Sequence, residues 1–158
     1  MILDAQHQFS DSQALTATAV GTNVIDLSLD RSIGNGEPMG VVFNVEVAAD
    51  QGSGDEDYTF DVEYSSSADQ SSGYVLMGRR IFESGTPAAP AQDADLLVVG
   101  YKFVIPIPTA TLDDSARYIG VRYTLAGTSP SVTVSAYLQP LSMIEVGQVD
   151  YADGYTIT

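Results

Sequence analysis

The sequence lacks several residue types on which catalysis and cross-linking depend. Its 158 residues include no cysteine and no tryptophan, so disulfides and thiolate metal sites are excluded. It has one histidine, His7, and one lysine, Lys102. Nucleophilic and general-base catalysis usually draw on histidine, cysteine or lysine. We therefore expect no enzymatic activity, no metal and no bound cofactor.

Basic residues are also scarce. Six lysines and arginines stand against 21 acidic residues, which gives a net charge of −15 and a pI near 4.1. Sequence-independent binding to DNA or RNA needs several clustered cations, so a nucleic-acid partner is not expected. No stretch approaches the roughly 18 apolar residues that span a bilayer, and the first residues do not resemble a secretory signal. We expect synthesis in the cytoplasm and no contact with a membrane.

Motifs of known enzyme classes are missing as well. The sequence contains no GxSxG, HExxH or Walker A pattern, and the glycines of residues 34–40 have the wrong spacing for a nucleotide-binding loop. The acidic pairs Asp61 with Glu63 and Asp113 with Asp114 could in principle serve a glycosidase. However, no sequence feature places either pair in an aromatic-lined cleft, and among 21 acids some pair lies close by chance.

The most acidic stretch is residues 50–57, with four carboxylates in eight residues. Calcium prefers such hard oxygen ligands, but the stretch does not match the twelve-residue EF-hand loop. A solvated surface loop is the main interpretation, and a weak calcium site is the alternative.

Alternation of apolar and polar residues dominates the rest of the chain. Met39–Val47 has five apolar residues at alternate positions, and residues 58–64 repeat the pattern with Thr59, Asp61 and Glu63 on the opposite face. This period of two is typical of strands with one buried and one solvent-facing side. Further strands are predicted over residues 15–20, 23–29, 74–82, 96–107, 117–125 and 131–138.

Turn sequences rich in glycine, proline and serine separate these strands, and helical periodicity is limited to one possible turn over residues 112–116. About eight antiparallel strands without βαβ alternation favour an all-β, two-sheet sandwich of the jelly-roll type, with a closed barrel as the second choice. The predicted domain spans residues 13–144, between an N-terminal arm, residues 1–12, and a C-terminal tail, residues 145–158.

The two ends of the chain carry isolated apolar anchors. These are Ile2, Leu3 and Phe9 in the arm and Tyr151, Tyr155 and Ile157 in the tail. Such segments either pack on their own domain or dock on a neighbour. Arg79 and Arg80 are further interface candidates, because arginine pairs well with carboxylates across an interface, although charge balancing within the chain is equally open.

Four stretches carry a resemblance to a known family: residues 1–6 (MILDAQ), 9–14 (FSDSQA), 22–27 (TNVIDL) and 33–39 (IGNGEPM). They resemble the Bbp16-like capsid cement proteins of tailed bacteriophages, most strongly over residues 1–48. The resemblance implies a jelly-roll protein that sits as homo-oligomers, dimers or trimers, on the outside of a shell built from an HK97-fold major capsid protein. It implies no catalytic residues.

On this interpretation, the protein reinforces the joints between capsid subunits. The N-terminal residues Ile2, Leu3 and Phe9 are the first candidates for capsid contact, and the turn formed by Asn35, Gly36, Glu37 and Pro38 is the second. The alternative is a β-sandwich carbohydrate- or receptor-binding module of a phage fibre or tail, since nine tyrosines make sugar stacking conceivable. Glycan binding by the isolated protein would distinguish the two.

Overall fold

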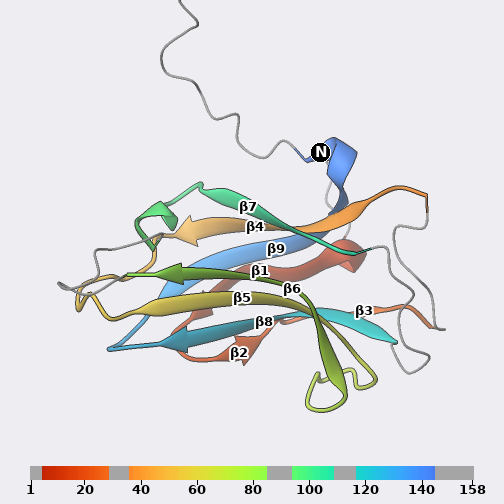
Figure 1. The fold of residues 1–158 in the computed structure, drawn as a ribbon, viewed down its shortest axis with the longest axis horizontal. Coiled ribbons are helices and arrows are strands. Elements are labelled where there is room, and N and C mark those ends of the chain that lie inside the picture. The colour runs from red at the N-terminus through yellow and green to blue at the C-terminus, as the bar shows by residue number, and fades with distance from the viewer. Residues whose placement is uncertain (1–4, 29–35, 85–93, 109–116, 145–158) are drawn as a thin grey trace, which may run out of the picture.

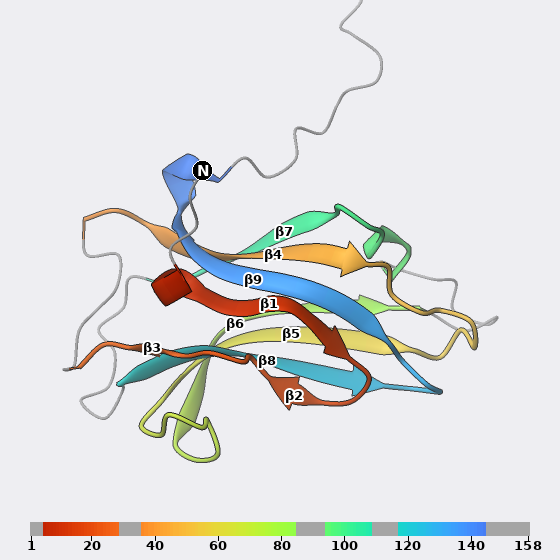
Figure 2. The ribbon, with the colours of Figure 1, turned by 180° about the vertical axis from the view of Figure 1, so that it is seen from behind.

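Two antiparallel β-sheets pack face to face in the structure, a computed structural model that describes residues 5–28, 36–84, 94–108 and 117–144 (Figures 1 and 2). The elements, in order, are η1 (Ala5–His7), β1 (Gln8–Leu15), β2 (Ala19–Val20), β3 (Ile25–Asp26), β4 (Met39–Val47), β5 (Asp57–Ser65), β6 (Tyr74–Glu83), η2 (Ala94–Leu96), β7 (Lys102–Pro106), β8 (Tyr118–Ala126), β9 (Val132–Pro140) and η3 (Leu141–Met143). The three η elements are single 3-10 turns.

The strand order identifies the type of sandwich. One sheet has the order β1-β9-β4-β7, and the other has the order β2-β8-β5-β6, with β3 also paired to β8. If β2 and β3 are taken as two pieces of one edge, eight strands interleave between two sheets as they do in a jelly roll. The all-β sandwich predicted from the alternating pattern is confirmed.

Aromatic rings fill the space between the sheets. Phe43 of β4 stacks on Phe103 of β7, with 4.9 Å between ring centroids. Phe60 of β5 and Phe82 of β6 meet Phe103 edge-on, at 5.0 and 4.9 Å. Because these rings come from both sheets and are at most 6% exposed, they tie the sheets into one rigid unit.

The first strand lies earlier than predicted. β1 begins at Gln8, inside the predicted arm, and ends at Leu15, so the strand predicted over residues 15–20 is wrong except at Leu15 and the two residues of β2. The pairing of β1 with β9 shifts register twice, and Ser12 has a φ of 45°. These irregularities break the alternation in the sequence and explain why the pattern did not reveal the strand.

Two other predicted strands are shorter than expected. Within residues 96–107 the strand covers Lys102–Pro106, because the chain first turns through η2 and through Gly100 at a φ of 85°. Within residues 23–29 the strand is limited to Ile25–Asp26, where Ser28 takes a φ of 63°. The turn predicted over residues 112–116 and the predicted tail, residues 145–158, lie outside the described residues.

Candidate interaction surfaces

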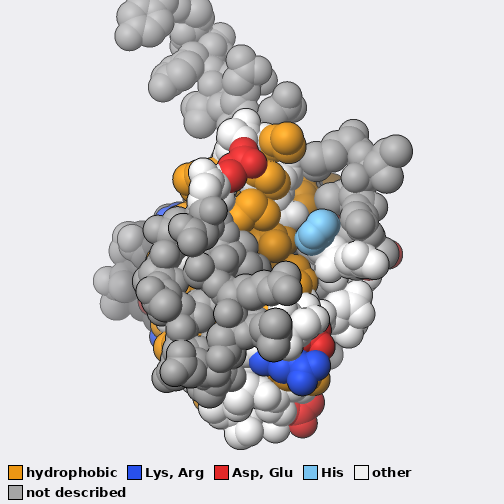
Figure 3. Space-filling view, turned by 90° about the vertical axis from the view of Figure 1, so that its right-hand side faces the viewer, with side chains coloured by type: hydrophobic (Ala, Val, Ile, Leu, Met, Phe, Trp, Pro, Cys, Tyr) orange, Lys and Arg blue, Asp and Glu red, His pale blue; other side chains and the backbone are white. Residues whose placement is uncertain are grey.

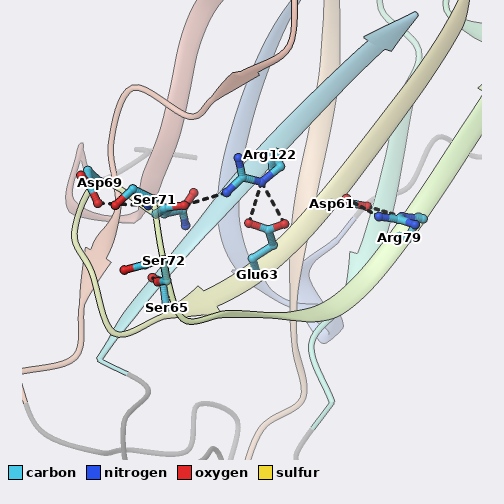
Figure 4. Close-up of polar contacts among 9 residues, drawn as sticks. Asp61, Glu63, Ser65, Asp69, Ser71, Ser72, Arg79 and Arg122 are labelled. Carbon is cyan, nitrogen blue, oxygen red and sulfur yellow. Dashed lines mark hydrogen bonds and ion pairs between the residues drawn. The ribbon is translucent and has the colours of Figure 1, made fainter.

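The acidic face of β5 is covered rather than open to solvent. Asp61 and Glu63 point away from the core as predicted, yet each is only 2% exposed. Arg79 of β6 reaches across to Asp61 in a two-point contact, with Nε 2.7 Å from Oδ1 and Nη2 2.8 Å from Oδ2 (Figure 4). The expectation that these acids face water is therefore wrong, because arginines on the neighbouring strands cover them.

Glu63 pairs with an arginine of β8, the strand on the opposite side of β5 from β6. Nε of Arg122, on β8, lies 3.0 Å from both carboxylate oxygens of Glu63 (Figure 4). Nη2 of Arg122 donates to the carbonyl oxygen of Gln70 at 2.8 Å, and its guanidinium lies 4.5 Å from the ring centroid of Tyr74. Burial nevertheless raises the pKa of Glu63, and Arg122 opposes that shift only in part.

The loop between β5 and β6, residues 66–73, covers the ion pair of Glu63 with Arg122. Asp69 accepts hydrogen bonds from the Ser67 hydroxyl and from the backbone N–H of Ser71, which lower its pKa to about 2. The hydroxyl of Ser65 donates to the carbonyl oxygen of Ser72 at 2.8 Å. Asp61 and Glu63 are thus both paired with arginines, and the loop covers the Glu63–Arg122 pair.

Arg79 and Arg80, the interface candidates of the sequence, interact within their own chain, and so does Arg117. Arg79 pairs with Asp61, and the guanidinium carbon of Arg80 lies 5.1 Å from the ring centroid of Phe82. Arg117 makes a two-point contact of 2.8 Å per bond with Asp26, and this hydrogen bonding lowers the pKa of Asp26 to about 2. Arg79 therefore balances the charge of a carboxylate in its own chain.

Residues 50–57 use their carboxylates to shape the loop itself. The carboxylate of Glu56 is buried and accepts from the backbone N–H groups of Ser53, at 2.9 Å, and Asp55, at 3.1 Å. The carboxylate of Asp55 in turn binds both the backbone N–H and the hydroxyl of Thr128. In the described parts of the chain, no three acidic or histidine side chains gather in a way that would hold a metal ion.

One predicted contact residue is part of the core. Phe9 is 0% exposed and belongs to the main hydrophobic cluster, so its role as a surface anchor is corrected: β1 places it between the sheets. The predicted interface residues Ile2, Leu3, Asn35, Tyr151 and Tyr155 lie outside the described residues.

The remaining residues of the predicted turn lie at one end of the sandwich. Gly36, Glu37 and Pro38 are exposed. The Pro38 carbonyl oxygen accepts from the N–H of Leu141 at 2.8 Å, and the Ser142 hydroxyl donates to the Glu37 carboxylate.

Apolar surface gathers at the same end. We call the region formed by η1, residues 36–38 and η3 the η1–η3 end, because η1 and η3 lie at the same end of the sandwich in both ribbon views (Figures 1 and 2). Met143 of η3 is 62% exposed there. Figure 3 views the molecule from this end and shows hydrophobic side chains gathered in its upper half.

A second apolar surface lies where β4 ends. Val47, Leu96, Val98 and Val99 are 42–68% exposed there, and we call them the β4–β7 tip. Backbone hydrogen bonds hold the tip in place, from Gly100 N–H to the Val45 carbonyl and from Ala49 N–H to the Leu97 carbonyl. The sequence predicted one strand over residues 96–107, so the exposed turn that contains Leu96, Val98 and Val99 was missed.

A third apolar surface follows strand β6. Tyr74, Val75, Leu76 and Ile81 are 44–51% exposed, and we call them the β6 edge. Alternation in the sequence showed the strand but not that it would lie at the side of a sheet, since that depends on the strand order.

Comparison with known proteins identifies the family. No curated protein matches the chain significantly. None of the described helices is long and apolar enough to cross a membrane. The Bbp16 family model matches residues 9–138, a continuous stretch from β1 into β9 that covers most of the chain. The chain therefore belongs to the Bbp16 family.

Proposed function

We propose that this protein is a capsid cement protein of a tailed bacteriophage, which binds the outside of an assembled HK97-fold shell and reinforces the joints between its subunits. The observation that carries the proposal is the Bbp16 match over nearly the whole jelly roll. The match itself points to a phage structural protein, and the cement role is the specific form that we infer.

The expected mechanism is mechanical. A protein that binds only the assembled shell stabilises that shell by mass action. If it grips two subunits at once, their joint cannot open without also breaking the cement contacts. The aromatic core between the sheets supports this role, because a rigid body transmits force between its contact points.

The η1–η3 end is the surface that we assign to capsid contact. It combines the exposed Pro38 and Met143 with η1, which begins two residues after Leu3 in the sequence. Apolar side chains beside exposed polar groups are typical of protein–protein contacts. The Asn35–Gly36–Glu37–Pro38 turn and the N-terminal residues thus remain the proposed contacts, without Phe9.

Paired substitutions at the two ends of the sandwich test this assignment. Met143→Asp should weaken binding to undecorated capsids by about tenfold or more, because it places a charge in an apolar contact. Val99→Asp, in the β4–β7 tip, makes the same charge change at a similarly exposed site and should bind as the wild type does. Equal binding by both variants, measured by co-sedimentation, would show that the η1–η3 end is not the contact.

The carbohydrate-binding alternative has weaker structural support. Among the described residues, Tyr74 is the one aromatic side chain with large exposure, and the Arg122 guanidinium already lies over its ring. A sugar-binding face would need open aromatic rings. Glycan binding by the purified protein, together with a failure to bind capsids, would nevertheless favour this alternative.

A further inference from the structure

The turn η3, which carries the exposed Met143, has little of its own to hold it in place. It spans three residues, none of them buried, and no side chain caps its start at Pro140. At its other end the chain continues in an extended conformation at Ile144. A single 3-10 turn is not stable alone, because one hydrogen bond must fix several backbone dihedral angles. The position of Met143 therefore depends on the contacts between η3 and the sandwich.

A buried side chain of β9 makes the first of these contacts. Gln139 is 5% exposed, and its Nε2 donates to the carbonyl oxygen of Met143 at 2.7 Å. The last carbonyl groups of a helical turn have no hydrogen-bond partner within the turn. The side-chain amide of Gln139 satisfies one of them, and the packing around it in the sheet restricts its movement. This hydrogen bond thus ties the backbone of Met143 to β9.

A glycine of β4 makes room for the second contact. Gly40 lies directly opposite Gln139 in the register of the two strands. A Cβ added to Gly40 would lie 2.6 Å from Cδ2 of Leu141 and 2.9 Å from Cγ1 of Val104. Val104 stands between two core residues of β7, so it points to the outer face of the sheet. Leu141, the first residue of η3, therefore packs on this outer face in the space that Gly40 leaves open.

The turn of residues 36–38 is joined to η3. The N–H of Leu141 binds the Pro38 carbonyl, and the Ser142 hydroxyl binds the Glu37 carboxylate. Residues 36–38 and η3 therefore form one unit, which the two contacts with the sheet fix on its inner side. A contact surface that is ordered before binding loses less conformational freedom when a partner arrives, so it binds more tightly than a loose one.

We propose that Gln139 and Gly40 are positioning residues for the capsid contact: they hold η3 against the sheet, so that Met143 projects from the η1–η3 end in the geometry that the shell binds. Both residues are buried, so they act through η3 and not by touching the capsid. This inference rests on the proposed function and deepens it, because it names the residues that give the contact surface its shape.

A double-mutant cycle on capsid binding tests the assignment. Gln139→Met keeps the length of the side chain but removes the N–H donor, and it should weaken binding to undecorated capsids by about three- to tenfold. In a Met143→Ala background the same substitution should have little further effect, because Gln139 acts through Met143. Equal fold-changes in the two backgrounds would overturn the proposal. The control Ser135→Ala removes another buried polar group of β9, the acceptor of the Ser12 N–H, and should bind as the wild type does.

Amide hydrogen exchange tests the same positioning without a capsid. The N–H groups of Leu141 and Ile144 donate to the carbonyls of Pro38 and Leu141, so their exchange reports on η3. Gln139→Met and Gly40→Ala should each speed this exchange by about threefold or more and leave the amides of β8 unchanged. Unchanged exchange at η3 in Gln139→Met would overturn the proposal.

The two proposals fail in different ways. A wild-type protein that does not bind capsids contradicts the cement role, and with it any positioning for that contact. A wild-type protein that binds capsids no better than Gln139→Met contradicts the positioning role alone.

Discussion

At the scale of single residues, the contact between Arg79 and Asp61 deserves an explicit test because it joins a buried acid to a half-exposed base. The side chain of Asp61 is 3% exposed and that of Arg79 is 49% exposed. Arg79→Ala leaves the carboxylate buried without its partner, which should lower the free energy of unfolding by about 2 kcal/mol, less than for a fully buried pair because solvent screens the arginine. Urea unfolding measures this loss.

A second substitution separates the lost ion pair from lost packing. In the Arg79→Ala background, Asp61→Asn removes the unpaired charge and should restore part of the stability. If the double variant is no more stable than Arg79→Ala, the loss comes from the aliphatic part of the arginine, and the ion pair is not what stabilises this face.

The raised pKa of Glu63 predicts how the stability of the protein changes with pH. Burial raises its pKa above 4.5 in the folded protein, so the folded state keeps a proton that the unfolded chain has already lost. The contribution of this group to stability therefore falls as pH rises through and above 4.5. The unfolding free energy of the wild type minus that of Glu63→Gln should decrease between about pH 4 and pH 7.

Asp26 provides the matched control for that experiment, because its pKa is shifted the opposite way, to about 2 from 3.8. The advantage of the wild type over Asp26→Asn should grow as pH rises from about 2 through 3.8, and it should be lost as pH falls through that range. If the Glu63 difference grew with pH in the same way, Arg122 would outweigh burial at Glu63.

At the scale of elements, the two sheets approach closely where β6 meets β7. A Cβ added to Gly78 would lie 2.4 Å from Cγ2 of Ile105, so Gly78→Ala must push the strands apart. We expect a loss of about 1–3 kcal/mol in unfolding free energy, as for other overpacked sites.

The control for this prediction is Gly52→Ala in the 50–57 loop, where the nearest atom to an added Cβ is Asp50 Oδ1 at 3.2 Å. Its effect should stay within about 0.5 kcal/mol. Equal stability of the Gly78 and Gly52 variants in urea unfolding would show that the β6–β7 approach tolerates a side chain.

Elements with regular alternation were predictable from the sequence, and irregular elements were not. Met39–Val47 matches its predicted bounds, because the apolar residues at alternate positions mark the strand clearly. The two faces were less predictable: Val42, on the opposite face, is buried, and Val47, at the end of the predicted buried face, is 57% exposed. β1 was misplaced because its register shifts against β9 interrupt the pattern. The burial of Asp61 and Glu63 depends on arginines from β6 and β8, strands distant in sequence, so alternation within β5 could not reveal it.

The candidate surfaces were likewise predictable only where local sequence determines them. The turn containing Glu37 and Pro38 was found because proline and glycine mark turns locally, and it is exposed as expected. Phe9 was misjudged because its flanking residues are polar, although β1 carries it into the core. The β6 edge required the strand order of a whole sheet, which local sequence does not contain.

At the scale of the whole molecule, charge and shape suit a protein present in many copies on one surface. A net charge of −15 disfavours nonspecific contact between copies, so specific contacts need surfaces with apolar side chains as well as charge. The η1–η3 end, with the exposed Met143 and Pro38, is such a surface and is the one that we assign to the shell.

The most direct test of the cement role is to titrate undecorated phage capsids with the purified protein, measure bound copies by co-sedimentation, and then heat the pelleted shells. The proposal predicts saturation at a fixed ratio to the major capsid protein and disruption of decorated shells at a higher temperature than bare ones. A folded protein that does not pellet with capsids, or that binds without raising the disruption temperature, would contradict it.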